Sequence, residues 1–339
     1  MTIEEGAINK QKIKKVCFII PYFGKLPNYF QLFLNSCKYN NKFNWLIFTD
    51  DNGIYEFPDN VKKINMTFEE CKKIIQNKFD FEICLPTPKK LCDYKPAYGW
   101  IFSEYLSEYK FWGYCDLDVI FGDISSFISE QMLEEYDKLY NLGHLTIYRN
   151  TDEINTMFMK PLNNKEIYKE IYQTPNMCCF DEWPAKSINN IFIQEKKNTF
   201  DGNDFADVGA YNSYFQLVYF NAKDKKWYEE NIKNNIFKWC NGKLLKLYEI
   251  NSELHSQEYM YIHLQKRNMK NNLSNIFCDE YYIVPNKFIE YQKSKELKLI
   301  NKYKYLIVFN YKALNKKIND IKYSLIEKIR TNIFKKALN

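Results

Sequence analysis

Two aspartates lie one residue apart in an apolar stretch near the middle of the chain. The stretch Phe111–Gly122 contains Asp116 and Asp118, separated by Leu117. Side chains alternate along a β-strand, so a strand here would turn both carboxylates to one face and Leu117 to the other. Two hard oxygen ligands side by side suit Mn²⁺ or Mg²⁺, which can also bind a diphosphate. We expect a divalent metal site here, and the alternative is a pair of solvated carboxylates in a turn.

A second acidic pair, Asp181 and Glu182, precedes Trp183 and Pro184. A carboxylate in such a pair can act as a general base and take a proton from a hydroxyl group. The indole of Trp183 can stack on a sugar ring. The alternative is structural, with Asp181 capping a helix that has Pro184 in its first turn.

In the first part of the chain, apolar runs typical of strands alternate with segments whose apolar residues have helical spacing. The predicted buried strands cover residues 15–20, 44–49 and 61–66. The spacing of apolar residues predicts a helix over 29–38, and Thr67 with Glu70 forms a capping box that starts another helix. This alternation predicts an α/β fold, a doubly wound Rossmann-type sheet flanked by helices, whose ligands bind beyond the carboxyl ends of the strands.

The region around the two aspartates continues the pattern. Pro96 suits the first turn of a helix that runs to about Tyr109. A further helix is expected over about 124–139 and a strand over 143–148.

Several residues at the predicted strand ends suit a nucleotide. Tyr22, Phe23 and Gly24 follow the first strand, and Asp50 ends the second. An aromatic ring can stack on a base such as uracil, and glycine lets the backbone approach a ligand closely. Asp50 can accept a hydrogen bond from the ribose or the base. Each of these residues can instead serve only to form its turn.

Asp93 and Lys95 stand just before the predicted helix at Pro96. The N-terminus of a helix favours anions, because its backbone N–H groups and dipole point towards them. We therefore expect Lys95 to contact a diphosphate or the sugar attached to it, with an ordinary surface lysine as the alternative.

The ten cysteines are scattered, and none forms the C-x-x-C pairs of a zinc site. Cys17 and Cys115 lie within apolar runs, where a free thiol packs as a small hydrophobic group. We expect reduced thiols and a cytoplasmic location. The vicinal pair Cys178 and Cys179 is the candidate for redox activity. No segment approaches the roughly 20 apolar residues of a membrane-spanning helix.

Charge is concentrated at the C-terminal end. Residues 293–339 contain 13 basic and three acidic residues, and the rest of the chain contains 35 basic and 39 acidic residues. The rest of the chain is mildly acidic and has no motif for reading bases, which argues against nucleic acid as a partner. A strongly basic tail favours an anionic surface.

The tail also has helical periodicity. An apolar stripe repeats at helical spacing through Leu314, Ile318, Ile321, Leu325, Ile329 and Ile333. A basic amphipathic helix lies readily on anionic lipid, which predicts a peripheral association with the inner face of the plasma membrane. The alternative is a helix that packs its stripe on the protein's own core.

Five blocks of the sequence, in this order, resemble a family of bacterial capsule and O-antigen glycosyltransferases. The blocks are Pro21–Gly24, Lys90–Gly99, Phe111–Gly122, Leu142–Asn150 and Tyr261–Arg267. The resemblance covers roughly residues 15–290 and implies a GT-A fold, in which an α/β sheet binds a nucleotide and a D-x-D motif binds the metal.

The resemblance also implies roles for particular residues. GT-A enzymes commonly add a C-terminal histidine to the metal or the diphosphate, and His263 matches that position, with Lys266 and Arg267 within reach of a phosphate. His263 can instead be a core histidine bonded to a backbone carbonyl. Asp181 and Glu182 are similar to the acidic pair that supplies the base in inverting enzymes, whereas a retaining enzyme needs no such base.

The sequence therefore predicts a polar segment (1–14), a GT-A-like domain (15–292) and a basic tail (293–339). The expected activity is metal-assisted transfer of a sugar from a nucleotide diphosphate, such as a UDP-sugar, to a glycan or lipid-linked acceptor of a surface polysaccharide. A nucleotidyltransferase would also use paired aspartates, but it would usually have a glycine-rich phosphate loop after the first strand. The remaining alternative is a non-catalytic glycan-binding or scaffold protein.

Overall fold

The computed structural model describes residues 14–209, 214–265 and 267–304. The chain divides into two compact units, each described by itself below. The first unit consists of the residues up to Val119 together with Ile124–Gly202, and the second consists of Ile120–Asp123 together with the residues from Asn203 onwards. The sequence analysis expected one domain over 15–292 and did not detect this division.

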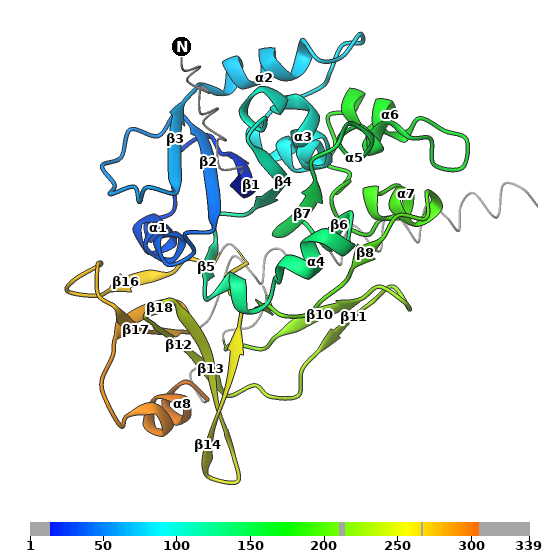
Figure 1. The fold of residues 1–339 in the computed structure, drawn as a ribbon. Coiled ribbons are helices and arrows are strands. Elements are labelled where there is room, and N and C mark those ends of the chain that lie inside the picture. The colour runs from blue at the N-terminus through cyan, green and yellow to red at the C-terminus, as the bar shows by residue number, and fades with distance from the viewer. Residues whose placement is uncertain (1–13, 210–213, 266, 305–339) are drawn as a thin grey trace, which may run out of the picture. The chain divides into compact units, whose positions relative to one another are not determined.

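A seven-stranded sheet forms the centre of the first unit, in the order β3-β2-β1-β4-β7-β6-β8 (Figure 1). Its strands are β1 (Lys14–Pro21), β2 (Phe43–Thr49), β3 (Val61–Asn65), β4 (Tyr109–Cys115), β6 (Lys138–Leu142), β7 (Leu145–Arg149) and β8 (Thr199–Phe200). Strand β1 is parallel to both β2 and β4, and β2 is parallel to β3. Strand β7 is antiparallel to β4 and β6. The mixed, mostly parallel sheet confirms the predicted α/β class.

The central strands are apolar because both of their faces are covered. Val16 to Ile20 of β1 are all buried, and the ring of Phe18 stacks on those of Phe43 and Trp45 in the neighbouring β2. These continuous apolar runs explain why the first two strands could be predicted from the sequence.

Short helices connect the strands of the first unit. They are α1 (Phe30–Lys38), α2 (Phe68–Gln76), η1 (Pro88–Ala97), α3 (Tyr98–Ile101), η2 (Ser103–Tyr105), η3 (Ile124–Ser126), α4 (Glu130–Glu135), α5 (Asp152–Asn155), η4 (Met157–Met159), α6 (Ile167–Gln173) and α7 (Ile188–Gln194), where η denotes a 3₁₀ helix. The capping box of α2 is confirmed. The Thr67 side chain accepts from the backbone N–H of Glu70, and the Glu70 carboxylate accepts from that of Thr67.

Two predicted helices were wrong. Pro96 lies within η1, only the short α3 and η2 follow, and the chain is already extended in β4 from Tyr109. The helix expected over 124–139 is replaced by η3, α4 and strand β6. Ser129 caps α4, and residues 138–142 pair with β7, so sheet pairing overrides the local helical spacing.

The second unit is mainly β-structure. Its six-stranded sheet contains β14 (Glu253–Tyr259), β13 (Lys243–Ile250), β12 (Asn235–Cys240), β17 (Glu280–Val284), β18 (Lys287–Glu290) and β16 (Lys270–Asn272), in that order. A three-stranded sheet contains β5 (Val119–Phe121), β15 (Tyr261–His263) and β9 (Ala206–Asp207), and a hairpin contains β10 (Val218–Asn221) and β11 (Lys226–Glu229).

The last described element, α8 (Glu296–Lys304), belongs to the core of the second unit. Ile300 and Tyr303 of α8 are buried in one apolar cluster with Ile236, Leu247 and Tyr282. The segment predicted as a tail therefore starts inside this unit. The stripe predicted over 314–333 lies outside the described residues.

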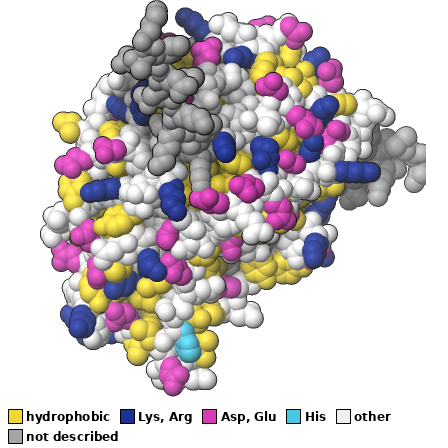
Figure 2. Space-filling model, in the orientation of Figure 1, with side chains coloured by type: hydrophobic (Ala, Val, Ile, Leu, Met, Phe, Trp, Pro, Cys, Tyr) yellow, Lys and Arg dark blue, Asp and Glu magenta, His cyan; other side chains and the backbone are white. Residues whose placement is uncertain are grey.

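Within the described ranges, no helix is long and apolar enough to cross a membrane. Acidic and basic side chains are interspersed over the face shown in Figure 2. On that face, neither sign of charge dominates the residues that are described.

Candidate active site

The candidate site of the first unit lies beyond the carboxyl ends of three neighbouring strands. Strands β2, β1 and β4 are adjacent and parallel, so their carboxyl ends share one edge of the sheet. The segments that follow them begin at Asp50, Tyr22 and Asp116, respectively. The fold thus brings three of the predicted segments to one place, as expected for an open α/β sheet.

The paired aspartates directly follow β4 and lie in its connection to β5, so they stand at the end of a strand. One carboxylate oxygen of Asp116 and one of Asp118 lie within 4.8 Å of each other. The Asp118 residue is only 9% exposed, whereas the Asp116 side chain is 31% exposed. The backbone N–H of Asp116 donates to the carbonyl of His144 at 3.1 Å, which fixes the end of β4 against β7.

The loop after β1 is tied to the end of β2. Gly24 has a φ of +95°, which glycine adopts without strain, and its N–H donates to the Asp50 carboxylate at 2.8 Å. The half-buried Tyr22 lies in the field of the aspartates, and burial together with the charge of Asp118 raises its pKa. Phe23 is buried and packs on Phe68, so its ring is part of the apolar core of this unit.

Lys95 reaches the paired aspartates from η1. Its ammonium donates to Asp116 at 2.8 Å and to the carbonyl of Gly143 at 2.8 Å, and it lies 3.4 Å from the Asp181 carboxylate. The ammonium also lies 5.3 Å from the centre of the Tyr114 ring. Lys95 therefore joins the D-x-D segment to the second acidic pair.

Asp181 is buried and Glu182 is partly buried beside this lysine. Burial raises the pKa of Asp181 to about 6, although the positive charge of Lys95 opposes the shift. Burial and the charge of Asp181 raise the pKa of Glu182 to about 8. The Glu182 carboxylate accepts from the backbone N–H of Gly143 at 2.9 Å. Since interacting groups titrate as a pair, the two carboxyls share about one proton near neutral pH.

Asp181 does not cap a helix. Helix α7 begins at Ile188, and Ser187 is its N-cap, with its side chain accepting from the N–H of Asn190. Asp181 and Glu182 lie in the turn before this helix, so the capping role considered for Asp181 is wrong.

Asp93 is fully buried and serves the scaffold. Its carboxylate forms an ion pair with Lys90 at 2.7 Å and accepts from the backbone N–H groups of Cys178 and Phe180. The ammonium of Lys90 also donates to the carbonyls of Ile171 and Asn176. This ion pair holds the segment that leads into Asp181, and the structure does not bring Asp93 to the strand-end site.

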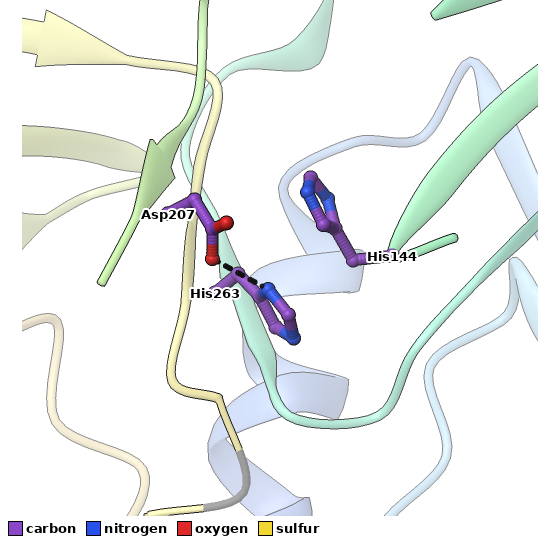
Figure 3. Close-up of side chains that lie close together, drawn as sticks. All are labelled: His144, Asp207 and His263. Carbon is purple, nitrogen blue, oxygen red and sulfur yellow. Dashed lines mark hydrogen bonds and ion pairs between the residues drawn. The ribbon is translucent and has the colours of Figure 1, made fainter. Parts of the chain in front are cut away.

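In the second unit, His263 is oriented by an acidic partner. Its Nδ1 atom forms a 2.8 Å hydrogen bond with Asp207, whose carboxylate also accepts from Gln265 (Figure 3). Both residues are buried, and their strands β15 and β9 pair in parallel. A carboxylate on one ring nitrogen fixes the tautomer of a histidine and makes the other nitrogen a better metal ligand.

The two basic residues that follow His263 differ in what the structure describes. Arg267 is buried, and it donates to the carbonyl oxygens of Gly209 and Tyr214. Burial lowers the pKa of its guanidinium to about 10. Arg267 therefore supports the chain around Gly209. Lys266 lies outside the described residues.

The sequence analysis missed two residues of these arrangements. Gly143 binds both Lys95 and Glu182, and a Cβ atom there would lie 2.6 Å from Asp181 and 2.7 Å from Glu182, so a larger residue would displace these two carboxylates. Asp207 is a charged residue between the apolar neighbours Ala206 and Val208. That pattern, a carboxylate inside an apolar run, was the available signal.

The first unit thus has a mixed α/β fold with clustered carboxylates beyond the ends of its parallel strands. Over residues 18–292, the chain matches the profile of a family described as "Family of unknown function (DUF6625)". The match covers most of the chain, and the protein belongs to this family. A comparison with curated proteins returned no match.

Two solved structures are similar to parts of the chain. One is the galactosyltransferase LgtC in complex with donor and acceptor sugar analogs, at 10% identity, with 57% of this chain and 75% of that chain covered and a TM-score of 0.32. The other is an active-site mutant of LgtC, at 10% identity, with 57% and 74% covered and a TM-score of 0.31. Scores this low do not transfer an activity, so the function is inferred below from the chain's own residues.

Proposed function

We propose that the protein is a glycosyltransferase that takes a sugar from a nucleotide-diphosphate donor with the help of Mn²⁺ or Mg²⁺. The observation that carries the proposal is the pair Asp116 and Asp118, whose carboxylate oxygens approach within 4.8 Å beyond the end of a central parallel strand. The five sequence blocks shared with capsule and O-antigen glycosyltransferases support the same activity.

The side chains present fit a divalent cation of this kind. Asp118 is a nearly buried carboxylate, and carboxylate oxygens are the ligands that Mn²⁺ and Mg²⁺ take in proteins. The negative charge of Asp118 also raises the pKa of Tyr22 and Tyr29 beyond the effect of burial. A metal held by Asp116 and Asp118 would neutralise the diphosphate as it leaves. His263, oriented by Asp207, remains the candidate for a further ligand.

The nucleotide is assigned to the loop after β1. Tyr22 is half-buried and can stack on a base, while Gly24 lets the backbone approach the ligand. The Asp50 carboxylate accepts from the N–H of Gly24 and so holds this loop in place. Asp50 is therefore proposed to support the loop as well as to contact the ribose.

Asp181 or Glu182 is proposed to act as the general base that takes the proton of the acceptor hydroxyl. When the acceptor oxygen attacks the anomeric carbon and the bond to the diphosphate breaks, the hydroxyl proton must pass to a base. Asp181, with a pKa raised to about 6, is poised to accept it near neutral pH, and Glu182 lies beside it. The acceptor is proposed to be a glycan or lipid-linked sugar of a surface polysaccharide.

The test is release of a nucleoside diphosphate from a panel of nucleotide sugars in the presence of Mn²⁺. We expect Asp118→Asn to abolish release because it replaces a charged carboxylate ligand with a neutral amide, whereas Asp59→Asn, at an exposed turn of the same unit, should keep full activity. A chelator should have the effect of the Asp118 substitution.

Other outcomes identify the alternatives. A nucleotidyltransferase would release pyrophosphate from a nucleoside triphosphate, and a glycan-binding protein would turn over neither substrate. An Asp118→Asn variant with normal turnover would show that the paired aspartates are not the metal site.

A further inference from the structure

Lys95 is placed between the proposed metal ligands and the second acidic pair. We infer that Lys95 is a built-in counter-ion that competes with the divalent metal for Asp116 and so couples metal binding to the Asp181–Glu182 pair. This inference rests on the proposed function, because it assumes that Asp116 and Asp118 bind the metal.

Two hydrogen bonds and an ion pair hold the ammonium of Lys95 inside the protein. An ammonium group has three N–H donors. The Lys95 ammonium meets three oxygen acceptors, on Asp116 and Gly143 at 2.8 Å each and on Asp181 at 3.4 Å. Its side chain is 12% exposed. A contact with a donor diphosphate, as the sequence analysis expected, would require the lysine to leave one of these partners.

Competition follows from the position of the charge. The ammonium lies directly on a carboxylate oxygen of Asp116, which is one of the two groups proposed to take the metal. A divalent cation at the same carboxylate would lie close to the ammonium, and like charges repel strongly where water is largely excluded. The metal must therefore displace the ammonium from Asp116 or bind more weakly beside it.

The displaced charge stays within the site. Lys95 is already in contact with Asp181 and with the carbonyl of Gly143, whose N–H binds Glu182. When the metal takes Asp116, Asp181 remains as the ion-pair partner of the Lys95 ammonium. Metal occupancy then shifts the ammonium towards Asp181, and one side chain links the two halves of the site.

The test is the affinity of the purified full chain for Mn²⁺ alone, measured by calorimetry for the wild type and Lys95→Met. We expect Lys95→Met to bind Mn²⁺ at least about five-fold more tightly, the lower end of typical coupling between two sites. Lys169→Met removes an exposed lysine of the same unit and should keep the wild-type affinity. Lys95→Arg restores a positive charge and should bring the affinity back towards that of the wild type.

Lys95→Gln covers the case in which Lys95→Met does not fold, because its amide can still donate to the Gly143 carbonyl. Equal or weaker Mn²⁺ binding in the folded neutral variants would overturn the inference but leave the proposed metal site in place. If neither the wild type nor any variant bound Mn²⁺, both the metal site and the role of Lys95 would be overturned. If Lys95 were merely structural, its replacement would lower the unfolding temperature without tightening metal binding.

Discussion

Asp181 is buried, Glu182 is partly buried, and the ammonium of Lys95 lies 3.4 Å from the Asp181 carboxylate. This combination gives the site its chemistry. Carboxyls of this kind keep a proton that an exposed acid would lose, because burial and a like charge both disfavour ionisation. The arrangement depends on Gly143, whose carbonyl accepts from the Lys95 ammonium and whose N–H donates to the Glu182 carboxylate. Perturbed carboxyls clustered around one lysine are typical of functional sites.

The raised pKa of Glu182 predicts a pH dependence of stability. The folded pKa, about 8, exceeds the ordinary value of 4.5, so between these limits the folded protein holds a proton that the unfolded chain has lost. The free energy of unfolding should therefore fall as the pH rises through this window, by at most about 1.4 kcal/mol per pH unit for one proton. Urea unfolding of the metal-free protein between about pH 5 and pH 8, which lies within this window, measures the slope.

Glu182→Gln imitates the protonated carboxyl and should remove this part of the slope. Glu69→Gln, at an exposed position of α2, should leave the slope unchanged. If the slopes of the wild type and Glu182→Gln agree, the carboxyl is ionised in the folded protein and the assigned shift is wrong.

At the scale of elements, the segment that carries the acidic pair is held by a buried ion pair. Lys90 and Asp93 of η1 are almost inaccessible, and together they bind backbone groups within residues 171–180. The same 3₁₀ helix carries Lys95. One element therefore positions the lysine directly and the carboxylates through the segment that it anchors.

We predict that Asp93→Ala lowers the free energy of unfolding by about 3–5 kcal/mol, because it leaves the charge of Lys90 buried without its partner. The N–H groups of Cys178 and Phe180 would lose their acceptor as well. Urea unfolding measures this change, and Asp59→Ala is the exposed control. A loss below about 1 kcal/mol, typical of a surface pair, would mean that the ion pair does not stabilise the segment.

The elements that could be predicted are those with a strong local pattern. Strands β1 and β2 are continuous apolar runs, and the cap of α2 is encoded by Thr67 and Glu70, three residues apart. The helices expected over 96–109 and 124–139 were wrong, and residues 138–142 form a strand because their pairing with β7 overrides the local spacing. The site divides in the same way. Asp116 and Asp118 stand out in the sequence, but their contact with Lys95 is formed only in the folded unit.

At the scale of the whole molecule, the chain contains two compact units and a basic C-terminal segment. Helix α8 packs Ile300 and Tyr303 into the core of the second unit, so a deletion that removes it would expose that core. Beyond the described residues, positions 313–339 contain seven basic and two acidic residues. This segment can be removed without cutting into α8.

We predict that deleting residues 313–339 abolishes binding to vesicles of anionic lipid and spares release of the nucleoside diphosphate. Each well-placed lysine or arginine contributes about 1 kcal/mol of attraction to an anionic membrane, and salt weakens it. Every residue proposed for catalysis precedes the deletion. Co-sedimentation with anionic and neutral vesicles at low and high salt measures the binding. Deletion of residues 2–13, which contain two basic and two acidic residues, is the matched control and should not change it.

Two results would contradict this assignment in different ways. A wild-type protein that ignores anionic vesicles at low salt would show that the charge of the segment does not serve a membrane. A truncated protein that becomes insoluble or loses donor hydrolysis would show that the segment packs on the protein or on a second copy, which is the alternative that its apolar stripe allows. Salt separates these cases, because electrostatic attachment to lipid weakens as the salt concentration rises, whereas burial of an apolar stripe does not.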